Sequence, residues 1–284
     1  KIKAGVDMPE LPEVETVKRT LQRLVTDKTI ADVDVRWGKI IKQPSDSEQF
    51  KTMLLGETIR DIERRGKFLR FILDHYVLVS HLRMEGKYRV ETPDVPIDKH
   101  THVIFRFTDG SELRYRDVRK FGTMHLFAKG TEWDHPPLNT LGPEPFDDDF
   151  NETYLRQVLK NTERTIKAVL LDQKVVTGLG NIYVDEALFR SGIHPQTTAK
   201  TLTKKQIRLL ATSIKKTLAE AVEMGGSSVR TYLNSQGEMG MFQQKLYVYG
   251  RKGEPCKQCG TLIEKTKTAG RGTHFCPKCQ GRVS

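Results

Sequence analysis

Met8-Pro9-Glu10-Leu11-Pro12-Glu13-Val14-Glu15 is the stretch that decides the fold, and it predicts the start of a helix. Pro12 suits a first helical turn, where its missing N–H leaves no bond unmade. Acidic residues there favour the positive end of the helix dipole. Apolar residues then recur at helical spacing, at Val14, Val17, Leu21 and Leu24. We therefore expect an amphipathic helix that packs one face on a core.

Pro9 gives this helix start a candidate chemical role. If Met8 is removed, Pro9 carries a free secondary amine, which can attack an electrophilic carbon and form an iminium. Glu10 and Glu13 lie beside it in the sequence, available for proton transfer. We expect Met8 to be the true start and residues 1–8 to be an extension or tag outside the fold.

Charge and composition indicate a protein that binds a polyanion. The 284 residues are enough for two domains. The net charge of +11 attracts polyanions, of which nucleic acid is the first candidate. The alternative is an ordinary protein that happens to be basic. No apolar run approaches the ~18–20 residues of a membrane span, and no signal peptide is visible. We therefore expect a cytoplasmic protein with no membrane partner, and a monomer because nothing points to an oligomer.

The four cysteines predict a metal site. They form two C-x-x-C pairs, Cys256/Cys259 and Cys276/Cys279, separated by 16 residues. That spacing is typical of a tetrahedral four-thiolate zinc site, and four thiolates leave no open position for catalysis. We expect one structural Zn²⁺ per chain and no other cofactor. Basic residues around the two pairs, Lys265 among them, suit contact with phosphate.

The first half of the chain reads as β structure. Apolar residues alternate over 33–37, 103–107 and 113–115, and a hairpin turn is predicted at 108–111. Three more short strands are expected at 68–73, 77–82 and 123–127. Many short strands with turn-sized gaps indicate a β-sandwich or barrel on which the first helix packs.

The second half reads as helical. Two helices are expected at 154–160 and 165–172, and a third is expected after a glycine-containing break at 177–181. A fourth, long helix is expected to begin at a capping box formed by Thr203 and Gln206 and to end at Gly225-Gly226. A polar loop over 225–242 is a candidate lid, and a strand is expected at 246–249. The predicted organisation is an extension at 1–8, a β domain at 9–135, a linker at 136–150, a helical domain at 151–244 and a zinc finger at 245–284.

Five motifs in this order resemble the formamidopyrimidine-DNA glycosylase family of bacterial base-excision repair enzymes. They are the stretch at 8–15, Arg-Gly-Lys-Phe at 65–68, Asp-Val-Arg-Lys-Phe-Gly at 117–122, Gly-Leu-Gly-Asn-Ile-Tyr at 178–183 and the four cysteines. The resemblance implies an α+β multidomain fold, with a β-sandwich and flanking helix, a helix-two-turn-helix domain and a β-hairpin zinc finger. It implies that the β domain at 9–135 is catalytic and that the helical domain at 151–244 binds DNA. It also implies a bifunctional glycosylase and abasic-site lyase that acts on 8-oxoguanine and ring-opened purines in duplex DNA, associated with the bacterial nucleoid.

The resemblance also implies catalytic roles for four residues. Pro9 would be the amine nucleophile and Glu10 its acid/base partner. Lys67 matches a lysine that contacts phosphate and assists elimination. Arg271 matches an arginine that grips phosphates at the lesion and takes part in the second elimination.

Further residues match the family's contacts to DNA and to the lesion. Met84, Arg119 and Phe121 match residues that fill the void left by a flipped nucleotide, and Asn181 and His100 match DNA contacts. The residues expected to read the lesion are Glu13, Glu85, Ser227 and Thr231.

Two other functions stay open at this point. One is an endonuclease VIII-like glycosylase for oxidised pyrimidines, against which Leu11 and the Arg119/Phe121 pair argue. The other is a zinc-finger protein that recognises damaged DNA without cutting it.

Overall fold

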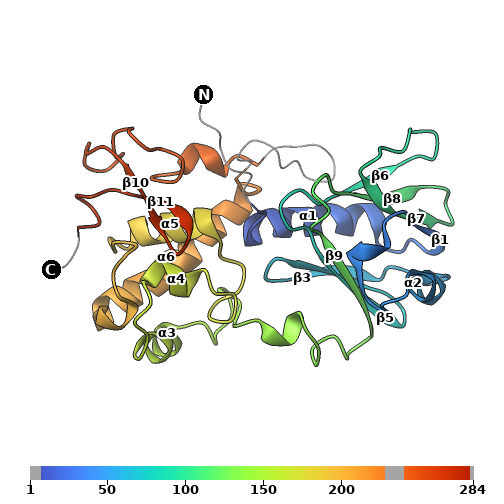
Figure 1. Cartoon of the computed structure of the whole chain (residues 1–284), viewed down its shortest axis with the longest axis horizontal. Helices are drawn as coiled ribbons and strands as arrows, with labels where there is room; N and C mark the ends of the chain where they lie inside the picture. Colours follow the sequence, from blue (N-terminus) through green and yellow to red (C-terminus); the bar gives the residue numbers. More distant parts are fainter. Residues whose placement is uncertain (1–7, 228–239, 282–284) are drawn as a thin grey trace. The chain divides into compact units, whose positions relative to one another are not determined.

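The computed structural model describes residues 8–227 and 240–281 (Figure 1). The chain divides into two compact units. Unit 1 comprises Lys1–Asn139 and Gly225–Gly240, and unit 2 comprises Thr140–Met224 and Met241–Ser284. Of the polar loop expected at 225–242, residues 228–239 lie outside the described part of the chain, and Thr231 with them.

The described residues of unit 1 form two β-sheets and two α-helices. The four-stranded sheet is antiparallel, in the order β1 (Ile30–Val35), β7 (Thr101–Phe107), β8 (Glu112–Arg116), β6 (Lys87–Glu91). The five-stranded sheet has the order β2 (Ile41–Gln43), β9 (Thr123–Ala128), β5 (Tyr76–His81), β4 (Phe68–Ile72), β3 (Asp61–Arg65), and its β2–β9 pair is parallel. Phe71 of one sheet packs on Tyr88 of the other, with ring centroids 5.3 Å apart. The predicted β-sandwich is confirmed.

The predicted first helix is α1 (Leu11–Val25). Its apolar stripe, including Val14, Val17 and Leu21, is buried in the same core as both sheets. Glu10 is the N-cap, and Glu10 and Glu13 cap each other's backbone N–H groups. The short helix α2 (Ser47–Leu54) begins at Asp46, whose carboxylate accepts from the Glu48 N–H.

The strands β2, β3 and β6 are not predicted by the sequence pattern. Each lies at the edge of its sheet; β2 has only three residues, and β3 and β6 are rich in charged residues. Charged side chains on an edge strand discourage pairing with another chain, and they also hide the period-two pattern by which strands are recognised.

Unit 2 contains four helices and a β-hairpin among its described residues. The helices are α3 (Glu152–Leu159), α4 (Ile166–Leu170), α5 (Asn181–Arg190) and α6 (Lys204–Glu223), and the hairpin joins β10 (Glu264–Thr268) to β11 (Arg271–Phe275). The capping box that begins α6 at Thr203 and Gln206 is present as predicted. Within the described ranges, no helix is both long and apolar enough to cross a membrane.

The strand expected at 246–249 is wrong. A 3₁₀ helix covers Phe242–Lys245, and the residues after it form turns and no strand. The buried carboxylate of Glu186 on α5 accepts the N–H groups of Tyr247, Val248 and Tyr249, each at 2.9 Å. Three consecutive N–H groups that point at one carboxylate cannot also form a β ladder, which requires them to alternate in direction.

Two histidines of unit 1, the buried His81 and the half-buried His125, predict a loss of stability in acid. Burial lowers the pKa of His81 well below its usual range, and burial lowers that of His125 to about 4. Below about pH 6.5 the unfolded chain therefore binds protons that the folded chain does not. The free energy of unfolding should fall between pH 7 and pH 5.5, by at most about 1 kcal/mol per pH unit for one such histidine.

Urea midpoints across this range measure the effect. The variant His125→Phe keeps a ring beside Phe127, on which His125 stacks at 5.9 Å, and removes one proton site. Its stability should depend less steeply on pH, and a slope equal to that of the parent chain would contradict the assignment.

Candidate active site and nucleic-acid interface

The start of α1 is buried and well ordered by hydrogen bonds. Pro9 is buried immediately before the helix, and Glu10 and Glu13 are 2 % and 4 % exposed. The Glu10 N–H donates to Glu13 Oε2 at 2.9 Å. Because Met8 precedes Pro9, the Pro9 nitrogen is an amide in this chain and becomes an amine only when Met8 is removed.

The other oxygen of Glu13 holds Ser227. Glu13 Oε1 accepts the Ser227 N–H at 2.7 Å and its hydroxyl at 3.1 Å. Gly226, with φ +80°, permits this approach, because a Cβ there would lie 2.7 Å from Glu13 Oε1. Two residues expected to read the lesion, Glu13 and Ser227, are therefore in direct contact.

Lys67 lies in the two-residue turn between β3 and β4, yet it is only 4 % exposed. Gly66 before it has φ +57°, which a tight hairpin turn requires. Arg64 donates to the Gly66 carbonyl and to Glu15 Oε2, both at 3.0 Å. Burial opposes ionisation of Glu15, but its bond to Arg64 and the nearby positive charges lower its pKa overall. Glu15 and Arg64 thus tie the Lys67 turn to α1.

Asp117 organises the loop that carries Arg119 and Phe121. Its buried carboxylate accepts the N–H groups of Arg119 at 3.0 Å, Phe121 at 2.9 Å and Gly122 at 2.8 Å. Phe121 is 51 % exposed, and the Arg119 guanidinium lies 4.9 Å from the centre of its ring. The loop therefore presents a cation and an aromatic ring to solvent from a backbone fixed by one carboxylate.

The Met84 loop lies beside the Asp117 loop, and Tyr115 packs against both. A Cβ on Gly86 would lie 2.2 Å from the Tyr115 hydroxyl, and one on Gly122 would lie 1.8 Å from it. The predicted void-filling residues Met84, Arg119 and Phe121 are thereby brought to one place. Glu85 is half-buried in the same loop.

His81 anchors the other end of the Met84 loop. Its Nδ1 accepts the Arg83 N–H at 2.9 Å, and its ring packs edge-on against Phe68, the residue after Lys67. Burial first, and then the charges of Arg83 and Lys67, lower its pKa and keep the imidazole neutral. His100, the remaining predicted contact of unit 1, is half-buried in the turn before β7, where its N–H donates to Asp98.

In unit 2, Asn181 begins α5 and contacts the finger hairpin. Its Nδ2 donates to the Gly272 carbonyl at 3.0 Å. Gly272 follows Arg271, so this bond sets the predicted phosphate contact beside the predicted catalytic arginine.

A buried ion pair reinforces this junction. Lys167 and Asp185 are both 0 % exposed, with Nζ and Oδ1 2.7 Å apart. Lys167 also donates to the Gly272 carbonyl at 3.2 Å, and Asp185 accepts the His274 N–H at 2.8 Å. Sequence reasoning missed Asp185 and Glu186, although two adjacent acidic residues inside an apolar helix were a signal that they are buried and paired.

Arg271 is exposed at the tip of the finger hairpin. The turn consists of Ala269 and Gly270, with φ +51° and +73°, the pair of positive values that a type I′ turn needs. Lys265 is exposed on the neighbouring strand, and its Cε would lie 3.0 Å from a Cβ on Gly272. The predicted basic contacts of the finger therefore project from a tight and defined turn.

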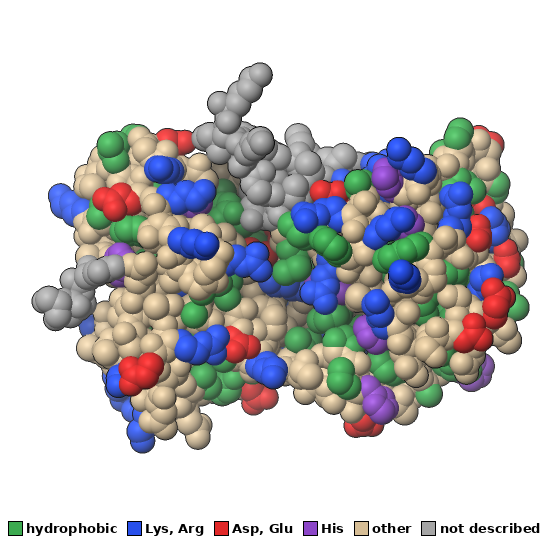
Figure 2. Space-filling view, viewed as in Figure 1, with side chains coloured by type: hydrophobic (Ala, Val, Ile, Leu, Met, Phe, Trp, Pro, Cys, Tyr) green, Lys and Arg blue, Asp and Glu red, His purple; other side chains and the backbone are tan. Residues whose placement is uncertain are grey.

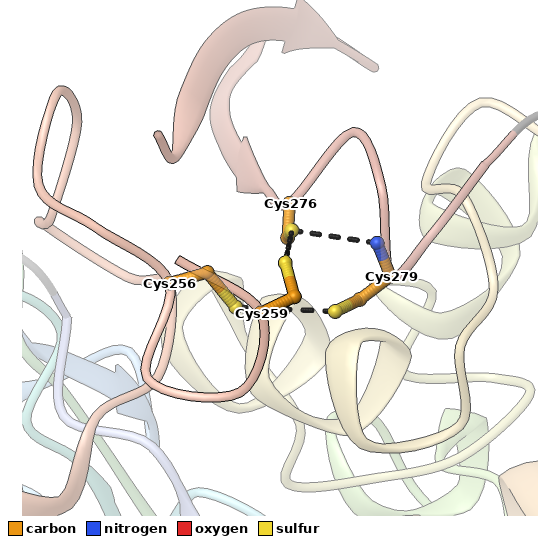
Figure 3. Close-up of side chains that lie close together, drawn as sticks. All are labelled: Cys256, Cys259, Cys276 and Cys279. Carbon is orange, nitrogen blue, oxygen red and sulfur yellow. Dashed lines mark hydrogen bonds between the residues drawn. The ribbon is translucent and has the colours of Figure 1, made fainter. Parts of the chain in front are cut away.

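The four cysteines converge as predicted (Figure 3). Their sulfur atoms all lie within 4.8 Å of one another, with Cys256–Cys279 at 3.9 Å and Cys259–Cys276 at 3.5 Å. A tetrahedral zinc with Zn–S bonds of ~2.3 Å separates its ligands by about 3.8 Å. The four thiolates fit one structural Zn²⁺, and they pin both ends of the finger hairpin together.

In Figure 2, lysine and arginine side chains are numerous on the drawn part of each unit taken by itself, and acidic side chains are fewer. This distribution agrees with 47 basic against 36 acidic residues in the chain. Such a surface attracts a polyanion.

The buried ion pair yields a stability prediction. Asp185→Asn leaves the Lys167 ammonium buried without its counter-charge, which should lower the free energy of unfolding by about 3–5 kcal/mol. Chemical denaturation measures this loss. The double variant Lys167→Met/Asp185→Leu removes both charges and should be less destabilised than Asp185→Asn, and an equal or larger loss would contradict the pairing.

Three family profiles match successive parts of the chain. The formamidopyrimidine-DNA glycosylase N-terminal domain matches residues 8–124, the H2TH domain of the same family matches 141–233, and a zinc finger found in FPG and IleRS matches 253–281. Together they cover most of both units.

Individual relatives agree with the profiles. The formamidopyrimidine-DNA glycosylases of Bacillus licheniformis and Bacillus subtilis are 68 % and 62 % identical over 273 residues, which is 96 % of this chain and 99 % of each relative. Lactococcus lactis Fpg in complex with DNA containing an abasic site has a similar structure, with a TM-score of 0.90 and 45 % identity over 96 % of this chain and 100 % of that one. A variant of the same enzyme bound to Fapy-dG containing DNA gives a TM-score of 0.91. The chain therefore belongs to the formamidopyrimidine-DNA glycosylase family.

Proposed function

We propose that the chain removes oxidised purines from duplex DNA and then cuts the strand as an abasic-site lyase, with Pro9 as nucleophile. Its membership of the family makes it a DNA glycosylase of oxidised-purine repair with one structural zinc. The observation that carries the residue assignment is the start of α1, where Pro9 directly precedes the buried carboxylate of Glu10, and the buried carboxylate of Glu13 follows in the first helical turn.

The chemistry follows from a free amine at Pro9. The Pro9 nitrogen lone pair forms a bond to C1′ of the damaged nucleotide, and the electron pair of the glycosidic bond leaves with the base. The N–H proton that Pro9 loses neutralises the departing base. The nitrogen lone pair then breaks the C1′–O4′ bond to form an iminium, and O4′ takes up a proton that comes from water. Glu10 moves these protons.

The iminium drives strand cleavage. It acidifies C2′, so loss of a C2′ proton expels the 3′ phosphate, and a second elimination expels the 5′ phosphate. In this proposal Lys67 and Arg271 bind the phosphates that leave. The Glu15–Arg64 contact serves as a positioning device, because it holds the Lys67 turn on α1.

The other residues bind the DNA and hold it open. A lesion inside a duplex has to be flipped out before an amine can reach C1′. Met84, Arg119 and Phe121 enter the gap, and Glu13, Glu85 and Ser227 contact the lesion. Thr231 is assigned to the lesion from the sequence alone, because it lies outside the described residues. His100, Asn181 and Lys265 contact the backbone, where helix α5 adds the positive end of its dipole at Asn181. Each chain carries the whole set of residues, so a monomer suffices, and binding to chromosomal DNA associates it with the bacterial nucleoid.

Pro9 is an amide as long as Met8 precedes it, so its role as nucleophile requires the removal of Met8. Trapping with borohydride tests this assignment. A chain that begins at Pro9 should give a covalent adduct with a duplex that contains 8-oxoguanine opposite cytosine, and mass analysis should place the adduct on Pro9.

In that chain, Pro9→Gly should strongly depress base release and leave DNA affinity nearly unchanged, because the substitution alters the nucleophile and not the binding surface. Pro12→Ala, in the same helix start, is the matched control and should keep the adduct. An adduct on another residue, or none with binding intact, would remove Pro9 from the mechanism.

Removal of zinc should weaken DNA binding and cleavage together, because the finger depends on the metal for its fold. Filter binding and strand cleavage after chelation measure both, and added Zn²⁺ should restore them. Cutting that persists after complete loss of zinc would contradict the role given to Arg271.

A further inference from the structure

Unit 2 contains a second basic surface, a groove of about 570 Å³ between the end of α5, the end of α6 and the first cysteine pair. We name it the α5–finger groove. It is lined by Phe189, Arg190, Lys216, Glu220, Gln244, Lys245, Tyr247, Lys257 and Gln258.

This groove lies away from the residues assigned to DNA in the same unit. Asn181 begins α5 and donates to the Gly272 carbonyl near the tip of the β10–β11 hairpin. Phe189, at the other end of α5, belongs to the buried cluster that contains Cys256 and Cys276, and Cys276 follows directly after β11. Ten helical residues span ~14 Å, and five strand residues span ~17 Å. The groove is therefore about that distance from Arg271 and Asn181.

The charge of the groove is positive and largely uncompensated. Arg190 makes two bonds to Glu220, at 3.0 and 2.7 Å, and this contact raises the pKa of Arg190 and lowers that of Glu220. Among the described residues that line the groove, Glu220 is the one carboxylate. Lys216, Lys245 and Lys257 are exposed and come from three different elements, so they leave a charge of about +3 facing solvent.

The wall of the groove is already formed. Tyr247 stacks on Phe189 with ring centroids 5.2 Å apart, and Lys257 lies 5.6 Å from the centre of the Tyr247 ring. The Tyr247 backbone is held on both sides, since its N–H donates to Glu186 and its carbonyl accepts from Arg251 at 2.6 Å. A surface fixed in this way costs little ordering entropy when a partner binds.

We infer that the α5–finger groove docks an acidic peptide segment of a partner protein. A groove of this volume is the size of an ordinary ligand pocket, and an extended peptide can place carboxylates against three separated lysines. Duplex DNA is stiff over lengths much greater than this groove, so its phosphates cannot follow the concave lining. This binding does not depend on the catalytic assignments above.

The test is binding of a fluorescein-labelled oligo-aspartate peptide to the zinc-loaded full chain, measured by anisotropy. We expect saturable binding that Lys216→Glu/Lys245→Glu weakens by at least about tenfold, because reversal of two charges turns attraction into repulsion. The matched control is Lys204→Glu/Lys205→Glu, which makes the same charge change at the exposed start of the same helix. It should leave peptide affinity within about twofold.

A duplex competitor separates an acidic peptide from DNA as the occupant. Undamaged duplex should not displace the labelled peptide from the groove. The two double variants should bind damaged duplex with equal affinity and cleave it at equal rates. Displacement by duplex, or a loss of DNA affinity confined to Lys216→Glu/Lys245→Glu, would show that the groove belongs to the DNA surface and overturn the inference. If the two double variants weakened peptide binding equally, the binding would depend only on the net charge of the chain. That result would also overturn the inference.

Discussion

Buried carboxylates that bind backbone N–H groups are the interaction on which both units depend. Glu13 holds Glu10 and Ser227, Asp117 holds the loop from Arg119 to Gly122, and Glu186 holds Tyr247 to Tyr249. A charge removed from water has to be matched by donors or neutralised. Each of these carboxylates therefore fixes a segment that has no sheet or helix to order it.

A fixed backbone also explains how exposed functional side chains stay in place. Arg119, Phe121 and Arg271 point into solvent, where few packing contacts restrain them. Their backbones are nevertheless fixed, by Asp117 in one case and by the tight turn next to Gly272 in the other. A rigid backbone beneath an exposed side chain lowers the entropy that binding must overcome.

In unit 2, two buried carboxylates of this kind lie on one helix, α5. Asp185 and Glu186 are adjacent on α5, but one binds Lys167 and β11 and the other binds the segment before the finger. Zinc closes the finger, while these two carboxylates attach it to the helices. The position of Arg271 therefore depends on groups that neither touch zinc nor reach the surface.

The sequence by itself determined the elements and the chemistry that local pattern encodes. Periodicity predicted α1, the core strands and α6, the spacing of cysteines predicted zinc, and the order of motifs predicted the family. The tertiary structure alone decided the edge strands β2, β3 and β6, the loss of the strand at 246–249 and the partners of the buried acids. The physical reason is distance along the chain, because Glu13 meets Ser227 across 214 residues and Asp185 meets His274 across 89. No local pattern records which distant N–H group will satisfy a carboxylate once the core has closed.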